Sequence, residues 1–415
     1  MTMPATPESC DVLIVGAGPA GSTAATLLTR AGRSVVVIDK AVFPRDKCCG
    51  DGLTTLALRE LEHLGLQPQT VPNWKTVDAA WLRSPSGREV CLPLPPGGIF
   101  AATTPRRELD AALLDLAITA GADVRQGVSF GSIRQGPQSV EVEVDAVGEG
   151  DGHTIEARYV IAADGMWSAT RKALGVGESG YLGEWHAFRQ YVGNVTGVAA
   201  ERLIVWFEPD LLPGYMWSFP LPDGRANIGF GVQRDGVRRV RDMKHEWDDL
   251  LRRPHVVEAL GAGFELEDRH TAWPIPAGID RATLTAGRVC FVGDAAMATD
   301  SMTGEGIGQA VLTGRLAAEA IVAGGALDGD AVAQRYASSV RHHLLADHKM
   351  SAILSKALSH ELGARGAIRL LASSNWMRRN FARWMFEDEP RAIAITPSRW
   401  HRHLFHQPGP YQPEP

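Results

Sequence analysis

The sequence predicts an α/β fold with three parts: a Rossmann-type domain, an inserted, mostly antiparallel β-sheet domain and a C-terminal helical region. Three observations predict it. A short apolar run near the N-terminus leads into a glycine-rich turn and a helix, the order found in a βαβ unit. Alternating aromatic and small residues over 213–232 predict a β-hairpin. Helical periodicity follows residue 325, and 415 residues suffice for two packed lobes.

Charge and cysteine content exclude several classes of protein. The formal net charge is −6, so the chain lacks the basic field of a nucleic-acid-binding protein. Its 5 cysteines are odd in number and scattered, which predicts neither a disulfide framework nor a zinc site. The N-terminus lacks the pattern of a signal peptide, and no apolar run reaches the roughly 18 residues of a membrane span. We therefore expect a cytoplasmic protein without a metal centre.

The first expected element is a buried strand over 11–15, followed at once by the glycine turn GAGPAG. A helix of small residues then ends at Gly32, and a second strand, SVVVID, ends in an acid. The glycines permit a tight turn and close approach of a pyrophosphate, which the helix N-terminus binds through its amide groups. The acid can bind the hydroxyls of an adenosine ribose. The candidate dinucleotide-binding residues here are Gly16, Gly18, Ala20, Gly21, Asp39 and Lys40.

Two later motifs indicate that the dinucleotide is FAD. An apolar strand in YVIAADGMWSATR ends in Asp164 and Gly165, and another in GRVCFVGD ends in Gly293 and Asp294. Asp294 can bond a ribityl hydroxyl, and the helix after a second glycine turn can direct its positive end at the flavin pyrimidine edge. That turn and helix supply Gly304, Gly306 and Ile307. Since the chain has one Rossmann fingerprint, NAD(P)H must bind transiently, or a reduced flavin or ferredoxin-type donor must replace it.

These motifs, in this order, resemble the para-hydroxybenzoate hydroxylase-type flavoproteins. Within them, FPRDKCCGDGL, LLPGYMWSFPLPDGRANIGFGV and GDAAMATDSMTGEGI resemble the geranylgeranyl reductase family, which includes menaquinone reductases; the resemblance covers residues 10–325. It implies that Arg106 of RRELD contacts FAD and that Cys49 lies beside the flavin ring. The Cys49 thiol is then a candidate proton donor, and a buried small apolar residue is the alternative. Many relatives have proline where this chain has Ser301, which weakens a direct transfer of the reductase activity.

The predicted Rossmann-type FAD-binding domain is thus interrupted by a substrate-binding β-sheet domain. The FAD-binding parts are 1–72, 104–180 and 279–325, the substrate-domain parts are 73–103 and 181–278, and the C-terminal helical region is 326–415. We expect strands in DAAWLRSPSGREVCLPL, EWHAFRQYVGNV and RLIVWFE to join the sheet that contains the hairpin.

The hairpin carries the candidate substrate site. Strand alternation places Tyr215, Trp217 and Phe219 on one face, opposite a return strand that contains Gly229. An aromatic face beside a glycine-rich one suits a flat or long apolar ligand, although an ordinary sheet core shows the same pattern. The resemblance favours the first reading, because it places this motif in the substrate cavity. We therefore expect these four residues to bind an apolar small molecule, with Cys49, Tyr215 and Trp217 as catalytic candidates.

The segment 375–386, NWMRRNFARWMF, predicts an amphipathic helix. A helical wheel gathers Trp376, Met377, Phe381, Trp384 and Met385 on one side, and Arg378, Arg379 and Arg383 on the other. Two interpretations stay open. The helix either packs on the body with a solvated basic face, or lies peripherally on the inner face of a membrane.

Four functions fit these observations. The resemblance favours reduction of a carbon–carbon double bond in an isoprenoid or other apolar substrate by hydride transfer from reduced flavin. The first alternative is an NAD(P)H-dependent monooxygenase that hydroxylates an aromatic or polyketide-like substrate, since fold does not fix function. A flavin-dependent halogenase needs a lysine, and Lys75 is the one lysine between residues 48 and 170. The fourth is a non-catalytic flavin-binding redox sensor.

Overall fold

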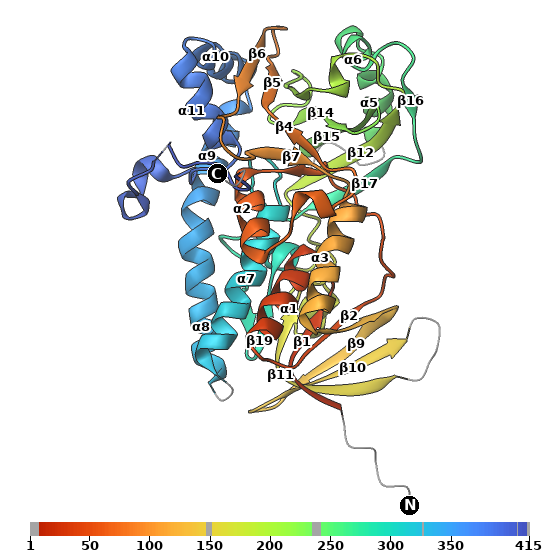
Figure 1. Cartoon of the computed structure of the whole chain (residues 1–415), viewed down its shortest axis with the longest axis vertical. Helices are drawn as coiled ribbons and strands as arrows, with labels where there is room; N and C mark the ends of the chain where they lie inside the picture. The colour runs from red at the N-terminus through yellow and green to blue at the C-terminus, as the bar shows by residue number, and fades with distance from the viewer. Residues whose placement is uncertain (1–7, 147–151, 235–241, 326–327, 405, 413–415) are drawn as a thin grey trace, which may run out of the picture.

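The computed structural model describes residues 8–146, 152–234, 242–325, 328–404 and 406–412. Figure 1 shows two stacked lobes, with a sheet and its helices below and a mostly antiparallel sheet above. Helices of the C-terminal third, drawn in blue, lie along one side of both lobes. The predicted α/β class is confirmed.

The lower lobe is built on an eight-stranded sheet. At its centre β1 (Glu8–Val15) pairs in parallel with β11 (His153–Ala162) and β2 (Val35–Asp39). The apolar run of β1 is buried because a parallel sheet of this kind is covered on both faces. The order is β18 (Thr285–Ala286), β19 (Val289–Phe291), β11, β1, β2 and β8 (Asp123–Gln126), while β10 (Val140–Ala146) pairs with β11 and β9 (Val128–Gln135).

Helices pack closely on this sheet because their facing residues are small. Helix α1 (Pro19–Arg30) contacts both α3 (Arg106–Ala120) and α7 (Ile307–Gly324). A Cβ atom on Gly314 of α7 would lie 2.2 Å from the carbonyl oxygen of Ala20. Helices α2 (Thr55–Leu64) and α8 (Gly329–Val340) also contact α7, and α4 (Ala169–Ala173) contacts β9.

The upper lobe is a second eight-stranded sheet, and it contains every strand that the sequence predicted there. Its order is β16 (Glu265–Leu266), β12 (Trp185–Gly193), β15 (Arg225–Gln233), β14 (Tyr215–Leu221), β13 (Leu203–Trp206), β5 (Ala79–Arg83) and β6 (Glu89–Pro93), with β17 (Thr271–Ile275) paired to β12. The β14–β15 pair is the predicted hairpin. Helices α5 (Met243–Leu250) and α6 (Pro254–Leu260) share a core with this sheet, in which Trp247 stacks on Phe230.

The remaining elements connect the lobes. Strands β3 (Gly52–Leu53), β7 (Ala101–Thr103) and β4 (Lys75–Val77) form a small sheet of their own. The expected C-terminal helices are α8, a π-helical turn (Arg341–Leu345), α9 (Ala346–Leu358), α10 (Glu361–Leu371) and α11 (Asn375–Met385). Helix α11 contacts β6 of the upper sheet. Among the described helices, none combines the length and apolar character that crossing a bilayer requires.

Candidate active site

A cavity of about 1600 Å³ is lined by both lobes. It exceeds the roughly 300–1,000 Å³ of pockets for drug-sized ligands, so it can hold a dinucleotide and a second ligand. Its nucleotide end is lined by Gly16, Gly18, Ala20, Asp39, Lys40, Arg106, Asp164, Gly165, Gly293, Asp294, Gly304, Gly306 and Ile307. Gly21 does not line it: a Cβ atom there would lie 1.9 Å from the Gly16 carbonyl oxygen, so its hydrogen lets α1 pack on the turn.

The nucleotide end fits FAD. Gly16 has a φ of 103°, and a Cβ atom there would lie 2.3 Å from the Ala163 carbonyl oxygen, so the turn requires glycine. The Oδ1 atom of Asp164 is buried and has no hydrogen-bond partner among the described residues, which leaves it available to a ligand. Asp39 accepts from the amides of Ala17 and Ala41, both at 2.8 Å, and so fixes the turn from the end of β2. Helix α7 begins at the cavity wall, where its positive end favours an anionic ligand.

Arg106 is buried at the start of α3. Its guanidinium bonds both carboxylate oxygens of Asp110 at 2.7 Å, and Arg45 contacts the same carboxylate at 2.8 Å. Both arginines line the cavity. Asp110 therefore holds both guanidinium groups at the cavity wall, where they can bind a phosphate of FAD.

The loop that contains Cys48 and Cys49 lines the middle of the cavity wall, and both residues are free thiols. Burial raises the pKa of the Cys49 thiol to about 12, so the group keeps its proton at neutral pH. The loop passes close to the hairpin: a Cβ atom on Gly52 would lie 2.9 Å from the ring of Phe219. The structure thus presents a protonated thiol, rather than a thiolate, beside the aromatic face.

Asp51 holds this loop in place, a role for which its own sequence neighbourhood gives no signal. Its buried Oδ2 accepts from the Tyr191 hydroxyl at 2.6 Å and from the Asn227 amide at 2.8 Å. Asn227 also donates to the Cys49 carbonyl at 2.8 Å and accepts from the Trp217 indole at 3.1 Å. Burial raises the pKa of Asp51 to about 6, although Tyr191 acts in the opposite direction. The partners lie 140 and 176 residues away along the chain, beyond any local motif.

The aromatic face of β14 lies where the hairpin pattern placed it. Tyr215, Trp217 and Phe219 all line the cavity, with ring centroids 6.1 Å apart in each successive pair. The Tyr215 hydroxyl donates to the Thr303 carbonyl and so ties the hairpin to the nucleotide end. Gly229 does not line the cavity, which corrects its predicted contact with substrate. A Cβ atom there would lie 2.5 Å from the Trp217 ring, so the glycine makes room for the indole.

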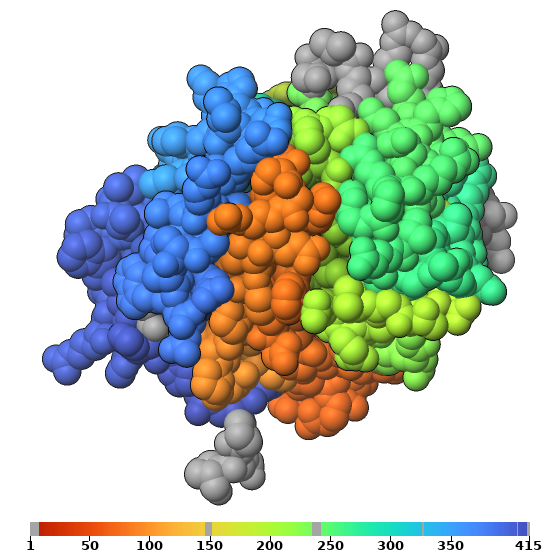
Figure 2. All heavy atoms as spheres, turned by 90° about the horizontal axis from the view of Figure 1, so that it is seen from above, coloured from red at the N-terminus to blue at the C-terminus, as the bar shows by residue number. Residues whose placement is uncertain are grey.

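The far end of the cavity is enclosed by C-terminal helices, which the sequence did not indicate. Side chains from three helices and two strands meet there, and nearly all are apolar. They include Leu354, Leu358, Ala367, Phe381, Trp384 and Met385 from α9–α11, and Leu82, Leu203 and Val205 from β5 and β13. Figure 2 shows the blue C-terminal helices against the orange strands that include β5 and β6.

The helical wheel for 375–386 is therefore partly wrong. Phe381, Trp384 and Met385 line the cavity, whereas Trp376 is 69% exposed. Arg383, assigned to the basic face, is 7% exposed and bonds Asp388 at 2.7 Å. A wheel shows which residues share a side of the helix, but it cannot show which elements cover that side.

Three further residues bear on the site. Ser301 does not line the cavity; its carbonyl accepts from the Trp185 indole at 3.0 Å and the Ser355 hydroxyl at 3.3 Å. Lys75 also lies outside it, paired with Glu201 at 2.8 Å, which removes it as a halogenase lysine. Lys47, two residues before Cys49, does line the cavity, with its ammonium 3.4 Å from the centre of the Trp273 ring. Burial lowers the pKa of Lys47 to about 8.

Comparison with known proteins agrees with this geometry. A family model described as "FAD binding domain" matches residues 9–338. The chain is 35% identical over 346 residues to a menaquinone reductase of Mycolicibacterium smegmatis, covering 77% of this chain and 78% of that protein. It is 31% identical over 319 residues to digeranylgeranylglycerophospholipid reductase 1 of Methanopyrus kandleri, covering 75% and 80%.

A solved structure supports the fold assignment. The geranylgeranyl bacteriochlorophyll reductase-like protein of Thermoplasma acidophilum superposes with a TM-score of 0.79 at 22% identity, covering 95% of this chain and 100% of that one. Together with the FAD motifs and the protonated thiol beside the hairpin, these matches show that the chain belongs to the geranylgeranyl reductase family of FAD-dependent oxidoreductases.

Proposed function

We propose that this oxidoreductase reduces a carbon–carbon double bond in the isoprenoid chain of an apolar lipid. The observation that carries the proposal is the apolar far end of the cavity, which continues from the aromatic face of β14 to α9–α11. A long hydrocarbon gains about 25 cal/mol for each Å² that it removes from water in such a site. The two relatives compared above are named for menaquinone and for digeranylgeranylglycerophospholipid.

The residues of this chain position the substrate and hold a proton. Bound FAD, once reduced, supplies the hydride that saturates one carbon. Asp51 and Asn227 fix the Cys49 loop relative to Trp217, so the thiol and the aromatic face keep one geometry. The protonated Cys49 thiol is suited to supply the proton for the other carbon. The electron donor, NAD(P)H or a reduced flavin or ferredoxin-type protein, binds transiently.

The same proposal includes contact with a lipid surface. Helices α9–α11 expose large apolar side chains while their other sides line the cavity. The exposed fractions are 65% for Ile353, 81% for Leu362, 57% for Leu370 and 69% for Trp376. A substrate that resides in a bilayer can enter where such residues insert. Co-sedimentation with anionic liposomes tests this: binding should fall in Trp376→Ser together with Leu362→Ser, and equal binding by wild type and variant contradicts it.

Anaerobic single-turnover kinetics tests the reaction itself. The photoreduced holoenzyme is mixed with a polyprenyl quinone or a polyprenyl diphosphate, and flavin reoxidation is followed with mass analysis of the product. We expect reoxidation without oxygen and a product that has gained two hydrogens. Reoxidation that requires oxygen, with a hydroxylated product, would support the monooxygenase instead.

A further inference from the structure

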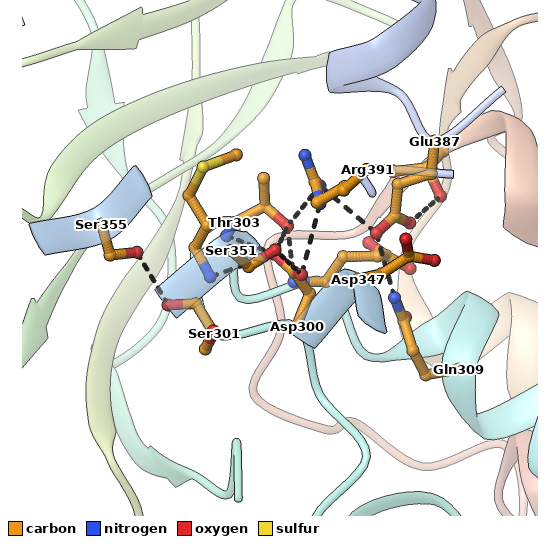
Figure 3. Close-up of polar contacts among 12 residues, drawn as sticks. Asp300, Ser301, Thr303, Gln309, Asp347, Ser351, Ser355, Glu387 and Arg391 are labelled. Carbon is orange, nitrogen blue, oxygen red and sulfur yellow. Dashed lines mark hydrogen bonds and ion pairs between the residues drawn. The ribbon is translucent and has the colours of Figure 1, made fainter. Parts of the chain in front are cut away.

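A buried charge cluster lies behind the nucleotide end of the cavity, between α7, α9 and the segment after α11. Figure 3 shows Arg391 between Asp300 and Glu387. The guanidinium lies 3.3 Å from a carboxylate oxygen of each, and it bonds the Thr303 hydroxyl at 3.2 Å. Glu305 belongs to the same cluster electrostatically, since its charge acts on Glu387. Three carboxyl groups therefore share one arginine.

Such a cluster cannot keep all its acids ionised, because uncompensated charge inside a protein is costly. Burial raises the pKa of Glu387 to about 8 and that of Glu305 to about 7. Burial also acts on Asp300, but Arg391 and Ser351 bring the pKa of this carboxyl below its usual value. Burial thus favours retention of a proton by Glu387 and Glu305 together near neutral pH.

Glu387 lines a second pocket and contacts Thr54, a residue that lines the large cavity. Its Oε2 accepts from the Thr54 hydroxyl at 3.1 Å, and Thr54 lines the large cavity. Its Oε1 accepts from Gln309 at 3.1 Å, on the side of a second pocket of about 350 Å³ that Glu387 and Gln309 both line. The backbone of Glu387 has a φ of 58°, which few residues other than glycine adopt.

The second pocket is suited to hold water. Within the described part of the chain, Arg391 Nη1, Gln309 Oε1 and His348 Nδ1 are buried without a hydrogen-bond partner, and all three residues line it. Water needs two to four polar partners, and each molecule takes about 30 Å³ in the liquid, so several fit. His342 lines the pocket and is exposed. Solvent can therefore reach the side of Glu387 that faces away from the cavity.

We propose that Glu387 supplies protons from this polar pocket to the substrate cavity through the hydroxyl of Thr54. The proposal rests on the proposed function, because each hydride added to a double bond requires one proton in a largely apolar cavity. In the structure the Thr54 hydroxyl donates to Glu387, so it must rotate for the transfer. The Glu387 O–H bond then breaks as the Thr54 oxygen accepts that proton, and Thr54 releases its own proton into the cavity. The resulting carboxylate regains a proton from water in the pocket, so no electrons move along this route. The thiol of Cys49 can be reprotonated in this way after each turnover.

The charged groups around Glu387 determine its proton affinity. Arg391 lowers it, while Asp300 and Glu305 raise it. Further out, Asp347 of α9 acts on Arg391, and Arg59 of α2 lines the second pocket. The other titratable or charged residues that line this pocket are Glu60, Arg315, His342, His343, His348, Asp388, Glu389 and Arg399.

Glu387→Gln is the test variant, because glutamine keeps the shape and one acceptor oxygen but carries no transferable proton. Glu60→Gln is the matched control: Glu60 lines the same pocket, but its carboxylate accepts from Arg315 at 2.7 Å rather than from Thr54. Infrared difference spectra of oxidised and photoreduced holoenzyme, in H₂O and D₂O, report on protonated carboxyls without any substrate. Single-turnover rates of substrate reduction over a range of pH form the second measurement.

We expect a carboxyl band, sensitive to D₂O, in wild type and Glu60→Gln and its loss in Glu387→Gln. The reduction rate of wild type should fall as pH rises through the pKa of Glu387, and Glu387→Gln should be about 10²-fold slower without that dependence. A Glu387→Gln enzyme with the same band and pH profile as wild type overturns the proposal. Should the band behave as expected while no polyprenyl substrate is reduced, the proposed function fails and the proton assignment stands.

A second pair of variants covers the case in which Glu387→Gln does not fold. Thr54 caps α2 by accepting from the Ala57 amide, so its hydroxyl has two tasks. Thr54→Ser keeps both and should retain the wild-type rate, whereas Thr54→Ala should be slowed. Thr54→Asn separates the tasks, because asparagine caps helices well but cannot relay a proton. A Thr54→Asn enzyme as fast as wild type contradicts the route.

Discussion

At the scale of single residues, Cys49 allows the most direct test of the proposed chemistry. Its thiol is protonated because burial raises its pKa to about 12, and serine has nearly the same size but gives up its proton far less readily. We expect Cys49→Ser to lower the single-turnover rate of substrate reduction by about 10²–10⁴ with unchanged FAD content. Cys91→Ser, in β6 outside the cavity, is the control. An unchanged rate in Cys49→Ser removes the thiol from the mechanism.

The buried carboxyl group of Asp51 should make the stability of the protein depend on pH. Its pKa is raised to about 6 in the folded chain from an ordinary value of 3.8, so its protonated form is favoured by folding. This contribution is complete below pH ~3.8 and is lost as pH rises through ~6. Relative to Asp51→Asn, which does not titrate, wild type should lose about 1–3 kcal/mol of unfolding free energy over that interval. Denaturant unfolding at several pH values measures the difference; parallel curves for the two proteins contradict it.

Sequence alone locates residues whose spacing is local. Gly16 and Gly18 of the first turn follow a strand end, and so do Asp164, Gly165 and Asp294. Their positions on the cavity wall are therefore predictable from the motifs. Asp51 and Glu387 are not, because their partners are distant in the chain: Glu387 contacts Thr54, 333 residues away. An isolated acid in a sequence gives no sign of whether folding will bury it.

At the scale of elements, the packing of the β14–β15 hairpin requires glycine at position 229 but not at position 231. A Cβ atom on Gly229 would lie 2.4 Å from the Phe188 carbonyl oxygen, a backbone atom that cannot move aside, whereas one on Gly231 would come no closer than 4.0 Å to Trp217. We expect Gly229→Ala to lower the free energy of unfolding by about 1–3 kcal/mol and to shift Trp217. Gly231→Ala should leave stability unchanged. Thermal unfolding of the two variants measures the difference in stability, and equal melting temperatures would contradict this packing.

Helix α11 shows what an amphipathic pattern can and cannot establish. Its existence and its two sides are predictable, but Phe381, Trp384 and Met385 line a cavity that forms only when α9, α10 and β13 come together. Because β13 is far from these helices in sequence, their meeting leaves no local signal. The small sheet of β3, β4 and β7 also leaves no local signal in the sequence. The strands of 73–103 therefore belong to two sheets, with β4 and β7 in the small sheet and β5 and β6 in the upper one.

Met385 allows the apolar end of the cavity to be tested. Met385→Gln has nearly the same volume, but it places an amide where a hydrocarbon chain would lie, and an unpaired buried amide costs about 1–3 kcal/mol. We expect KM to rise roughly 5- to 150-fold for long polyprenyl substrates and to change little for short ones. Trp376→Gln, at an exposed site on the same helix, should leave both values unchanged in detergent. An equal rise in KM for long and short substrates would show that the hydrocarbon chain of the substrate binds elsewhere in the protein.

At the scale of the whole molecule, three distant segments of the FAD-binding lobe meet the C-terminal helices in the walls of one cavity. Contacts across that cavity link these regions to one another. The Tyr215 hydroxyl bonds the loop before α7, and Arg391 bonds Thr303 of the same loop. A ligand held by that loop therefore acts on the hairpin and on the segment after α11 at once. Residues from 15 to 386 line this one cavity.

Binding of FAD should consequently stabilise more than the residues that touch it. At 100 times its Kd, a ligand that binds only the folded state adds about 2.7 kcal/mol. We expect hydrogen exchange to slow on adding FAD to apoprotein at residues 16–21, 163–165 and 293–307, and also in α9 and α11. Helix α6, which contributes no residue to the cavity, is the internal control. Protection confined to the three motif segments would show that the C-terminal helices close the cavity independently of FAD, because coupling through Arg391 and Thr303 requires both regions to respond.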